Sequence, residues 1–197
     1  MSDIEHKTKI FLLRHARSKA AEDGIVQGQG LHVPLTEEGR AHAERTAARI
    51  ADFHFDVIFS SRALRAIETV RPIRALHPDV PYAEIGELNE RSKGNTEGMP
   101  NEEFNRRYPH IIEAWARDED IRPPEGGENF EDVERRVIPV VEAHIREYPI
   151  GSTLLYVGHG NVNRVILGHM LGIPYGLRAR IKQGYCAVNA ISYDHTE

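Results

Sequence analysis

Short runs of hydrophobic residues alternate along this chain with longer stretches in which hydrophobic residues recur at helical spacing. The short runs are rich in β-branched or aromatic residues, which favours buried strands. They cover residues 10–14, 57–60, 82–85, 153–157 and 187–193. Strands that alternate with helices predict an α/β fold, here a three-layer sandwich with a mostly parallel central sheet flanked by helices.

Four longer stretches have the pattern of amphipathic helices. One begins at Thr36, a good N-cap, and a second covers about 63–74. A third follows Asn129, and Pro139 is expected to kink or interrupt it. Its repeating positions are Val133, Val137, Val140 and His144. The last begins near Asn161 and stops at Gly172.

Residues 86–127 interrupt this alternation with polar and aromatic residues, several prolines and no strand pattern. We expect this segment to form a small lid over one end of the sheet, with Trp115 as its packing anchor. No composition shift or internal repeat marks a second domain. The chain, 1–197, is therefore predicted to be a single domain with a lid insertion.

Charge and composition argue against several classes of protein, among them nucleic-acid-binding and membrane proteins. The net charge of −5 gives no broad basic field, which argues against nucleic-acid binding as the main role. No apolar run approaches the ~20 residues of a membrane span, and the first residues carry charges of both signs, so we expect a cytoplasmic protein without membrane partners. One cysteine, Cys186, excludes an internal disulfide. The sequence leaves the oligomeric state open, a homodimer included.

Two of the predicted strands end on a histidine, His15 after the first and His159 after a later one. Arg14 precedes His15, Arg65 follows the second strand, and Glu90 follows the third. Carboxyl ends of parallel strands meet at one edge of a sheet, so these groups should lie together. Two arginines beside two histidines suit a phosphoryl dianion, and the same arginines would oppose a metal ion. The sequence therefore predicts a phosphoryl site without a metal or cofactor.

Several motifs, taken in chain order, resemble the histidine phosphatase superfamily, which includes cofactor-dependent phosphoglycerate mutases. The likeness covers nearly the whole chain and fits the phosphatase branch of this phosphoglycerate mutase-like family. The matching segments are Leu12-Leu13-Arg14-His15, Pro34-Leu35-Thr36-Glu37-Glu38-Gly39, Ser61-Arg62-Ala63-Leu64-Arg65-Ala66, Leu88-Asn89-Glu90-Arg91, Gly126-Gly127-Glu128-Asn129 and Val157-Gly158-His159-Gly160.

The resemblance implies a role for each group at the site. His15 would be the nucleophile and become phosphorylated, and Arg14, Arg65 and His159 would hold the phosphoryl group. Glu90 would donate a proton to the leaving oxygen. The substrate-binding residues are expected to be Arg14, Arg17, Gln27, Gly28, Arg65, Arg91, Gly160 and Asn161.

Two positions depart from the family pattern. Ala16 replaces the glycine that usually follows the nucleophile. Its methyl group would crowd a phosphate unless the local backbone tolerates it, and we expect the pocket to survive. Ala21 stands where the family often has asparagine, which removes one phosphate contact.

We predict a phosphomonoesterase that hydrolyses a small phosphorylated metabolite through a phosphohistidine. One alternative is a phosphoglycerate mutase, although mutases of this family have a longer cap than 86–127 provides. A second is a weakly active regulator that binds phosphorylated ligands, and a third is a metal hydrolase that uses His15, His159 and Glu90. The sequence does not identify the phosphate ester.

Overall fold

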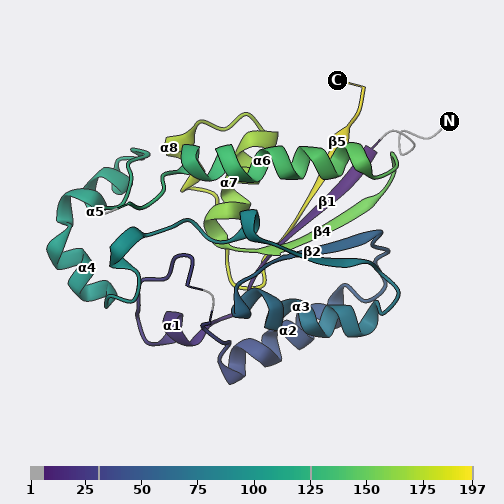
Figure 1. The fold of residues 1–197 in the computed structure, drawn as a ribbon, viewed down its shortest axis with the longest axis horizontal. Helices are drawn as coiled ribbons and strands as arrows, with labels where there is room; N and C mark the ends of the chain where they lie inside the picture. Colours follow the sequence, from purple (N-terminus) through teal and green to yellow (C-terminus); the bar gives the residue numbers. More distant parts are fainter. Residues whose placement is uncertain (1–6, 31, 125, 197) are drawn as a thin grey trace.

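The computed structural model describes residues 7–30, 32–124 and 126–196, and within them five strands form a single sheet (Figure 1). The strands are β1 (Lys7–Arg14), β2 (Val57–Ser61), β3 (Tyr82–Ile85), β4 (Thr153–Gly158) and β5 (Val188–Asp194). Their order across the sheet is β3-β2-β4-β1-β5. The first four are parallel, and β5 runs antiparallel to β1 at the edge. All five predicted strands and the mostly parallel sheet are confirmed.

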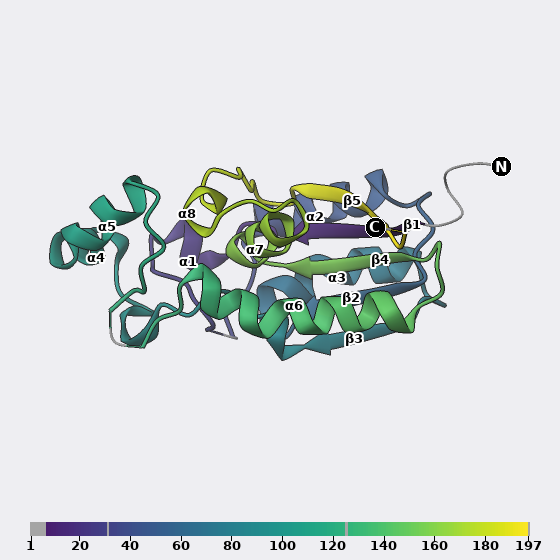
Figure 2. The ribbon, with the colours of Figure 1, turned by 90° about the horizontal axis from the view of Figure 1, so that it is seen from above.

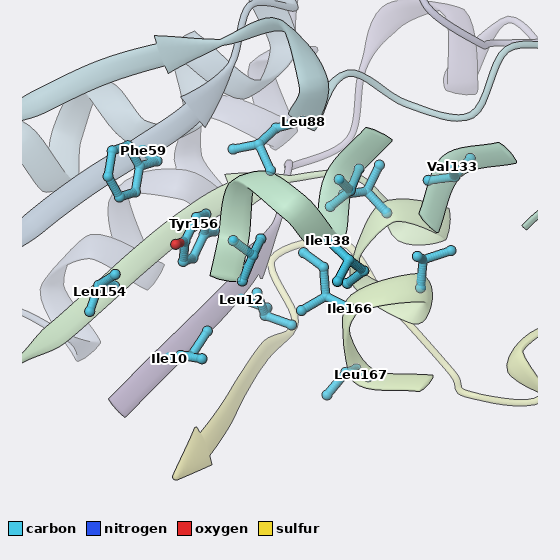
Figure 3. Packing of buried hydrophobic residues seen from close by; sticks show 14 of the residues in the cluster. Ile10, Leu12, Phe59, Leu88, Val133, Ile138, Leu154, Tyr156, Ile166 and Leu167 are labelled. Carbon is cyan, nitrogen blue, oxygen red and sulfur yellow. The ribbon is translucent and has the colours of Figure 1, made fainter. Parts of the chain in front are cut away.

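The central strands are apolar on both faces, because each face is covered by helices. On β1, Ile10 and Leu12 point to one side, whereas Phe11 and Leu13 point to the other. The first side packs against α6 (Phe130–Glu147) and α7 (Gly160–Met170), as Figure 3 shows for Ile138 and Ile166. The second packs against α2 (Glu37–Arg49) and α3 (Leu64–Leu76). Figure 1 shows the strands between these helix pairs, with α6 and α7 above the sheet and α2 and α3 below it, which confirms the three-layer prediction.

Helix α2 begins as predicted, because the Thr36 side chain accepts a hydrogen bond from the Gly39 N–H at 2.9 Å. Asn129 caps α6 reciprocally: its side chain accepts from the Asp132 N–H at 2.9 Å, and the Asp132 carboxylate accepts from the Asn129 N–H at 3.1 Å. Helices α3 and α7 cover the predicted stretches to within a few residues.

The expectation that Pro139 interrupts the third helix is wrong, since α6 runs through it from Phe130 to Glu147. Pro139 lies on the exposed face, and the opposite face buries a continuous apolar stripe against the sheet. That burial outweighs the ~3 kcal/mol cost of an interior proline. The stripe also differs from the prediction, because Val141 and Ile145 are buried while Val140 and His144 are only half-buried.

Residues 86–127 lie beyond the carboxyl ends of the parallel strands (Figures 1 and 2). The segment contains two 3-10 turns, η1 (Gly86–Leu88) and η2 (Gly94–Thr96), and two helices, α4 (Asn101–Arg107) and α5 (Pro109–Ala116). Trp115 packs with Val26, Phe104 and Ile111 in a small separate core. The packing role expected for Trp115 is confirmed, and the closing of a lid stays a prediction.

Two further short helices, α1 (Lys19–Glu22) and α8 (Tyr175–Arg178), were not predicted from the sequence. Among the described residues, no helix combines the length and the apolar character that a membrane crossing requires. The predicted cytoplasmic location stays a prediction, and the charged first residues lie outside the described part.

Candidate functional site

The two strand-end histidines lie side by side because β1 and β4 are neighbours. Arg14 and Gly158 are partners in the parallel register, and the His15 N–H donates to the Gly158 carbonyl at 2.9 Å. The rings of His15 and His159 are 5.1 Å apart between centroids, and both side chains are buried. The predicted meeting of the two histidines at one edge of the sheet is confirmed.

The His15 ring is held in one tautomer. Its Nδ1 lies 2.7 Å from the Ala16 carbonyl oxygen, which can only accept, so Nδ1 carries the proton. Burial lowers the pKa of His15 well below its usual value, and the charges of Arg65 and then Arg14 lower it further. At neutral pH the ring is therefore uncharged, and Nε2 has a free lone pair suited to nucleophilic attack.

Ala16 does not crowd this site, in agreement with the expectation that the pocket survives the missing glycine. Its side chain is fully buried among the core residues between the sheet and helices α2 and α3. Its N–H donates to the Thr69 hydroxyl at 3.0 Å, and that hydroxyl donates to the Arg65 carbonyl at 2.6 Å. The segment after His15 is therefore anchored to the same helix, α3, that carries Arg65.

His159 is oriented by a chain of hydrogen bonds. The Asn89 side-chain oxygen accepts from the Arg62 N–H at 3.1 Å and from the Ser61 hydroxyl at 2.9 Å. The Ser61 oxygen therefore accepts from His159 Nε2 at 2.8 Å, which leaves Nδ1 to face a ligand. Burial, followed by the charge of Arg65, lowers the pKa of His159 well below its usual value. Neutral His159 thus presents a lone pair, and an anionic ligand would bring a proton to this atom.

Arg14 and Arg65 are fixed by backbone carbonyls rather than by carboxylates. Arg65 is 1% exposed and donates to the carbonyls of Gly28 and Gly30, both at 2.8 Å. Arg14 donates to the Gln183 carbonyl and stacks on Tyr185, with 4.2 Å between its guanidinium carbon and the ring centroid. Because no acidic side chain neutralises either guanidinium at these contacts, both retain their charge for a ligand.

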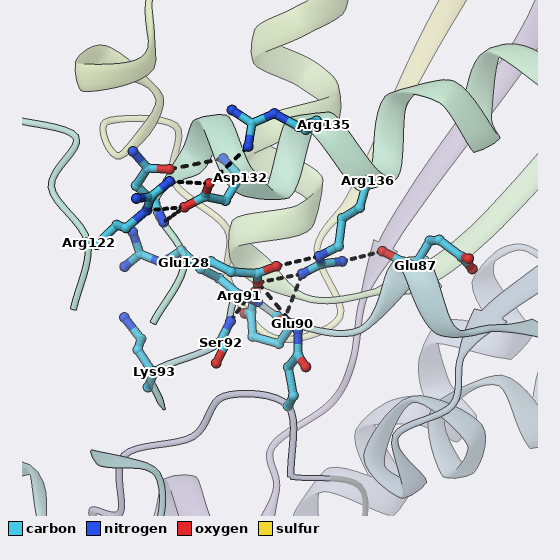
Figure 4. A network of polar contacts seen from close by, with 12 residues as sticks. Glu87, Glu90, Arg91, Ser92, Lys93, Arg122, Glu128, Asp132, Arg135 and Arg136 are labelled. Carbon is cyan, nitrogen blue, oxygen red and sulfur yellow. Dashed lines mark hydrogen bonds and ion pairs between the residues drawn. The ribbon is translucent and has the colours of Figure 1, made fainter. Parts of the chain in front are cut away.

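Glu90 is placed by backbone contacts on both sides. One carboxylate oxygen accepts from the Arg91 N–H at 2.8 Å, and the other accepts from the Asn161 N–H at 3.3 Å at the start of α7. Arg136 of α6 holds this loop by donating to the carbonyls of Glu87 and Glu90 (Figure 4). This arrangement fixes Glu90 beside the first turn that follows His159.

Arg136 is itself held by Glu128, whose carboxylate accepts from its Nε at 2.8 Å and from the Ser92 N–H at 2.8 Å. The Gly126-Gly127-Glu128-Asn129 motif therefore has a structural basis, because Glu128 joins α6 to the loop that carries Glu90. Arg136 belongs to no motif, and the sequence offered no signal for it.

Unsatisfied nitrogen atoms surround His15. Buried side-chain nitrogens in proteins nearly always have hydrogen-bond partners. In the described part of the chain five lack one, and three of these are Arg14 Nε, Arg65 Nε and His159 Nδ1. The Arg14 and Arg65 charges act on both histidine rings, so the three atoms belong to one site. Such a site can bind an oxyanion against the Nε2 of His15.

The other predicted substrate residues divide into two groups. Gly28, Gly160, Arg91 and Asn161 contact or adjoin the residues above, and Gln27 lines a cavity that also reaches Arg65. Arg17 lies apart.

Arg17 pairs with Glu38 at 3.2 Å and lines a separate cavity together with Ala21. Its contact with substrate stays a prediction. Within residues 7–30, 32–124 and 126–196, no three histidine, cysteine or acidic residues are grouped to hold a metal ion.

Comparison with known proteins gives a consistent result. The family model described as histidine phosphatase superfamily, branch 1, matches residues 10–197. The 2,3-bisphosphoglycerate-dependent phosphoglycerate mutase 2 of Gloeobacter violaceus is 34% identical over 167 residues, which cover 83% of this chain and 75% of that protein.

Two solved structures share the fold over almost their whole length. YhfR of Bacillus stearothermophilus has a TM-score of 0.87 and 27% identity, with 95% of this chain and 92% of that chain covered. The alpha-ribazole phosphatase of Shigella flexneri has a TM-score of 0.82 and 26% identity, with 95% and 91% covered. Since the family model spans nearly the entire chain and its motifs meet at one edge of the sheet, this protein belongs to the histidine phosphatase superfamily.

Proposed function

We propose that this protein is a phosphomonoesterase that hydrolyses a small phosphorylated metabolite through a phosphohistidine on His15. The observation that carries the proposal is the neutral His15 ring, whose Nδ1 is bound to a carbonyl and whose neighbours include three unpartnered buried nitrogens. A nucleophile with a free lone pair among fixed positive charges suits attack on phosphorus.

The first step forms one bond and breaks one. His15 Nε2 attacks the phosphorus atom, and the bond from phosphorus to the alcohol oxygen breaks. The Glu90 carboxyl gives its proton to the leaving alcohol. Arg14 and Arg65 neutralise the phosphoryl oxygens, and a proton on His159 Nδ1 binds another oxygen.

The second step regenerates the enzyme. Water attacks the phosphorus atom and gives a proton to the Glu90 carboxylate, while the bond between nitrogen and phosphorus breaks. The released product is inorganic phosphate. Glu90 serves both steps, first as the acid for the leaving alcohol and then as the base for water. Its contacts with the N–H groups of Arg91 and Asn161 support this role, because they hold the carboxyl group in a fixed position.

A phosphoglycerate mutase is the second candidate, and the 34% identity to a protein of that name favours it. A mutase must keep water away from its phosphohistidine, which requires an enclosing cap. The short segment 86–127 supports hydrolysis instead. The named phosphatase among the structural neighbours supports the same choice.

An assay of both reactions separates these candidates. We expect 3-phosphoglycerate with catalytic 2,3-bisphosphoglycerate to give little 2-phosphoglycerate, whereas at least one ester in a panel of phosphorylated metabolites releases phosphate readily. Mutase turnover far above phosphate release on every ester would overturn the proposal. Vanadate should inhibit, and activity lost to EDTA and restored by added metal would favour a metal hydrolase.

A further inference from the structure

A cavity of about 300 Å³ is lined by Arg91 and Asn161, the two residues whose N–H groups bind the Glu90 carboxylate. Its wall includes three cationic side chains, Arg91, Lys93 and Arg164, together with the rings of Trp115 and Phe130. The wall also carries three carboxylates, those of Asp118, Glu119 and Asp120. The charge that the cavity offers to a ligand therefore depends on which of these groups already have partners.

None of these three cations is neutralised by an ion pair within the described residues. Arg91 is 5% exposed, and its Nε is buried without a hydrogen-bond partner. Its guanidinium carbon lies 5.0 Å from the ring centroids of both Trp115 and Phe130. The two aromatic rings thus hold the Arg91 guanidinium in place by cation–π contact, but they give its Nε no hydrogen-bond acceptor.

Lys93 and Arg164 are also held by neutral groups. The Lys93 ammonium lies 4.4 Å from the centroid of Trp115, and no dashed contact reaches this side chain in Figure 4. Arg164 donates to the Ile181 carbonyl at 2.9 Å and to the Asn161 side-chain oxygen at 3.1 Å.

The carboxylates that line the same cavity are already engaged elsewhere. Asp118 pairs with Arg180, and Glu119 pairs with Arg117 at 2.7 Å. The Asp120 carboxylate accepts from the N–H groups of Phe130 and Glu131 at the start of α6. These contacts give each carboxylate a partner, whereas Arg91, Lys93 and Arg164 have no ion pair in the described residues, so the charge left without a partner at the cavity is positive.

Glu90 links the cavity to the site around His15. Its carboxylate accepts from the backbone N–H groups of Arg91 and Asn161, two residues of the cavity wall. Its charge acts on Arg65 at the phosphoryl site and also on the three cations of the cavity. In the proposed reaction, the cavity is therefore next to the group that protonates the leaving alcohol. The alcohol part of a substrate would extend into it.

We propose that Arg91, Lys93 and Arg164 form a subsite for a second anionic group, a carboxylate or a second phosphate, carried by the alcohol part of the substrate. This inference rests on the proposed hydrolysis at His15. The subsite would select phosphate esters that carry a second anionic group on the alcohol part, apart from the phosphate that is transferred. Esters whose alcohol part is neutral or cationic would be poorer substrates.

The subsite has a pH dependence of its own. Burial lowers the pKa of Lys93 to about 7, with further lowering by Arg91 and Arg164, while Glu90 and Glu97 act in the opposite direction. The protonated amine binds the anion, and the neutral amine does not. The preference for a dianionic ester should therefore decline as the pH rises above about 7.

Matched small esters test the subsite. We expect kcat/KM for 2-phosphoglycolate, which carries a carboxylate, to exceed that for ethyl phosphate, with phosphoethanolamine below both. Ethylene glycol bisphosphate distinguishes a second phosphate from a carboxylate. We define the preference as kcat/KM for phosphoglycolate divided by kcat/KM for ethyl phosphate. Lys93→Met should lower this ratio by about 10- to 100-fold, the usual effect of losing one charged contact.

Two further variants sharpen the result. Lys93→Arg should keep the preference and remove its decline above pH 7, because a guanidinium stays charged. Arg106→Gln, which removes an exposed charge from α4 outside this cavity, serves as the control and should leave the ratio unchanged.

Equal rates for phosphoglycolate and ethyl phosphate in the wild-type protein would overturn the subsite and leave the phosphatase proposal intact. Loss of all hydrolysis would overturn the phosphatase proposal, and calorimetric binding of the same esters then tests the subsite alone. In that measurement, tighter binding of phosphoglycolate that weakens in Lys93→Met supports the subsite, and equal binding of both esters overturns it.

Discussion

Replacement of His15 by alanine is expected to lower kcat by a factor on the order of 10⁶, as removal of a covalent nucleophile does in other enzymes. The variant keeps the cationic pocket but has no lone pair to attack phosphorus. Steady-state release of phosphate from the best ester of the panel measures the loss. His54→Ala removes an exposed histidine that pairs only with Asp56, so it is a suitable control with unchanged turnover.

The losses of activity caused by replacing His15 and Arg65 should not be additive. Arg65→Ala alone should cost orders of magnitude, because Arg65 carries charge to the phosphoryl group and holds the carbonyls of Gly28 and Gly30. In the double variant His15→Ala with Arg65→Ala, the total should be close to the larger single loss. Additive losses would show that the two side chains do not act in the same step.

Replacement of Glu90 by glutamine is expected to slow alkyl phosphates by ~10²–10⁴, the usual range for general acid catalysis. A p-nitrophenyl leaving group needs little protonation, so p-nitrophenyl phosphate should be affected far less. The measurement is kcat for both esters in the wild-type and variant proteins.

Glu87→Gln is the matched control for this variant, because Glu87 is an exposed carboxylate of the same loop. It should leave both esters unaffected. If Glu90→Gln instead lowered kcat equally for the two esters, Glu90 would have a positioning role only. It would hold its loop through the N–H groups of Arg91 and Asn161 and would not donate a proton.

The sequence was sufficient to predict the parts of the site that depend on strand ends. Apolar runs fix where β1 and β4 lie, and a parallel sheet brings their carboxyl ends to one edge. His15 and His159 therefore could be placed together before any coordinates were known, with Arg14 beside them. Arg65 followed from the same rule, because it lies in the first turn of the helix after β2.

Residues that act through loop packing could not be predicted. Ser61 and Asn89 stood within recognisable motifs, but only the fold shows that they orient His159. Arg136 comes from the middle of α6 and reaches a loop far away in the sequence. No motif marked Lys93, because its surroundings depend on how Trp115 packs.

One expectation failed for a physical reason that a local pattern does not contain. Pro139 did not interrupt α6, because the burial of the opposite helix face decides whether the helix continues. The expectation for Ala16 agrees with the structure, because the backbone after His15 turns the methyl group into the core. In both places tertiary packing decides the outcome, and the residue type alone does not contain it.

The central claim is that His15 carries the phosphoryl group during turnover, and trapping this intermediate tests it most directly. Brief incubation with a ³²P-labelled ester, followed by rapid denaturation in alkali, should give protein-bound label that is stable to base and lost in acid, as expected for a phosphoramidate. Peptide mapping should place the label on His15, and His15→Ala should carry none. Label that persists in His15→Ala, or label that resists acid, would contradict the account.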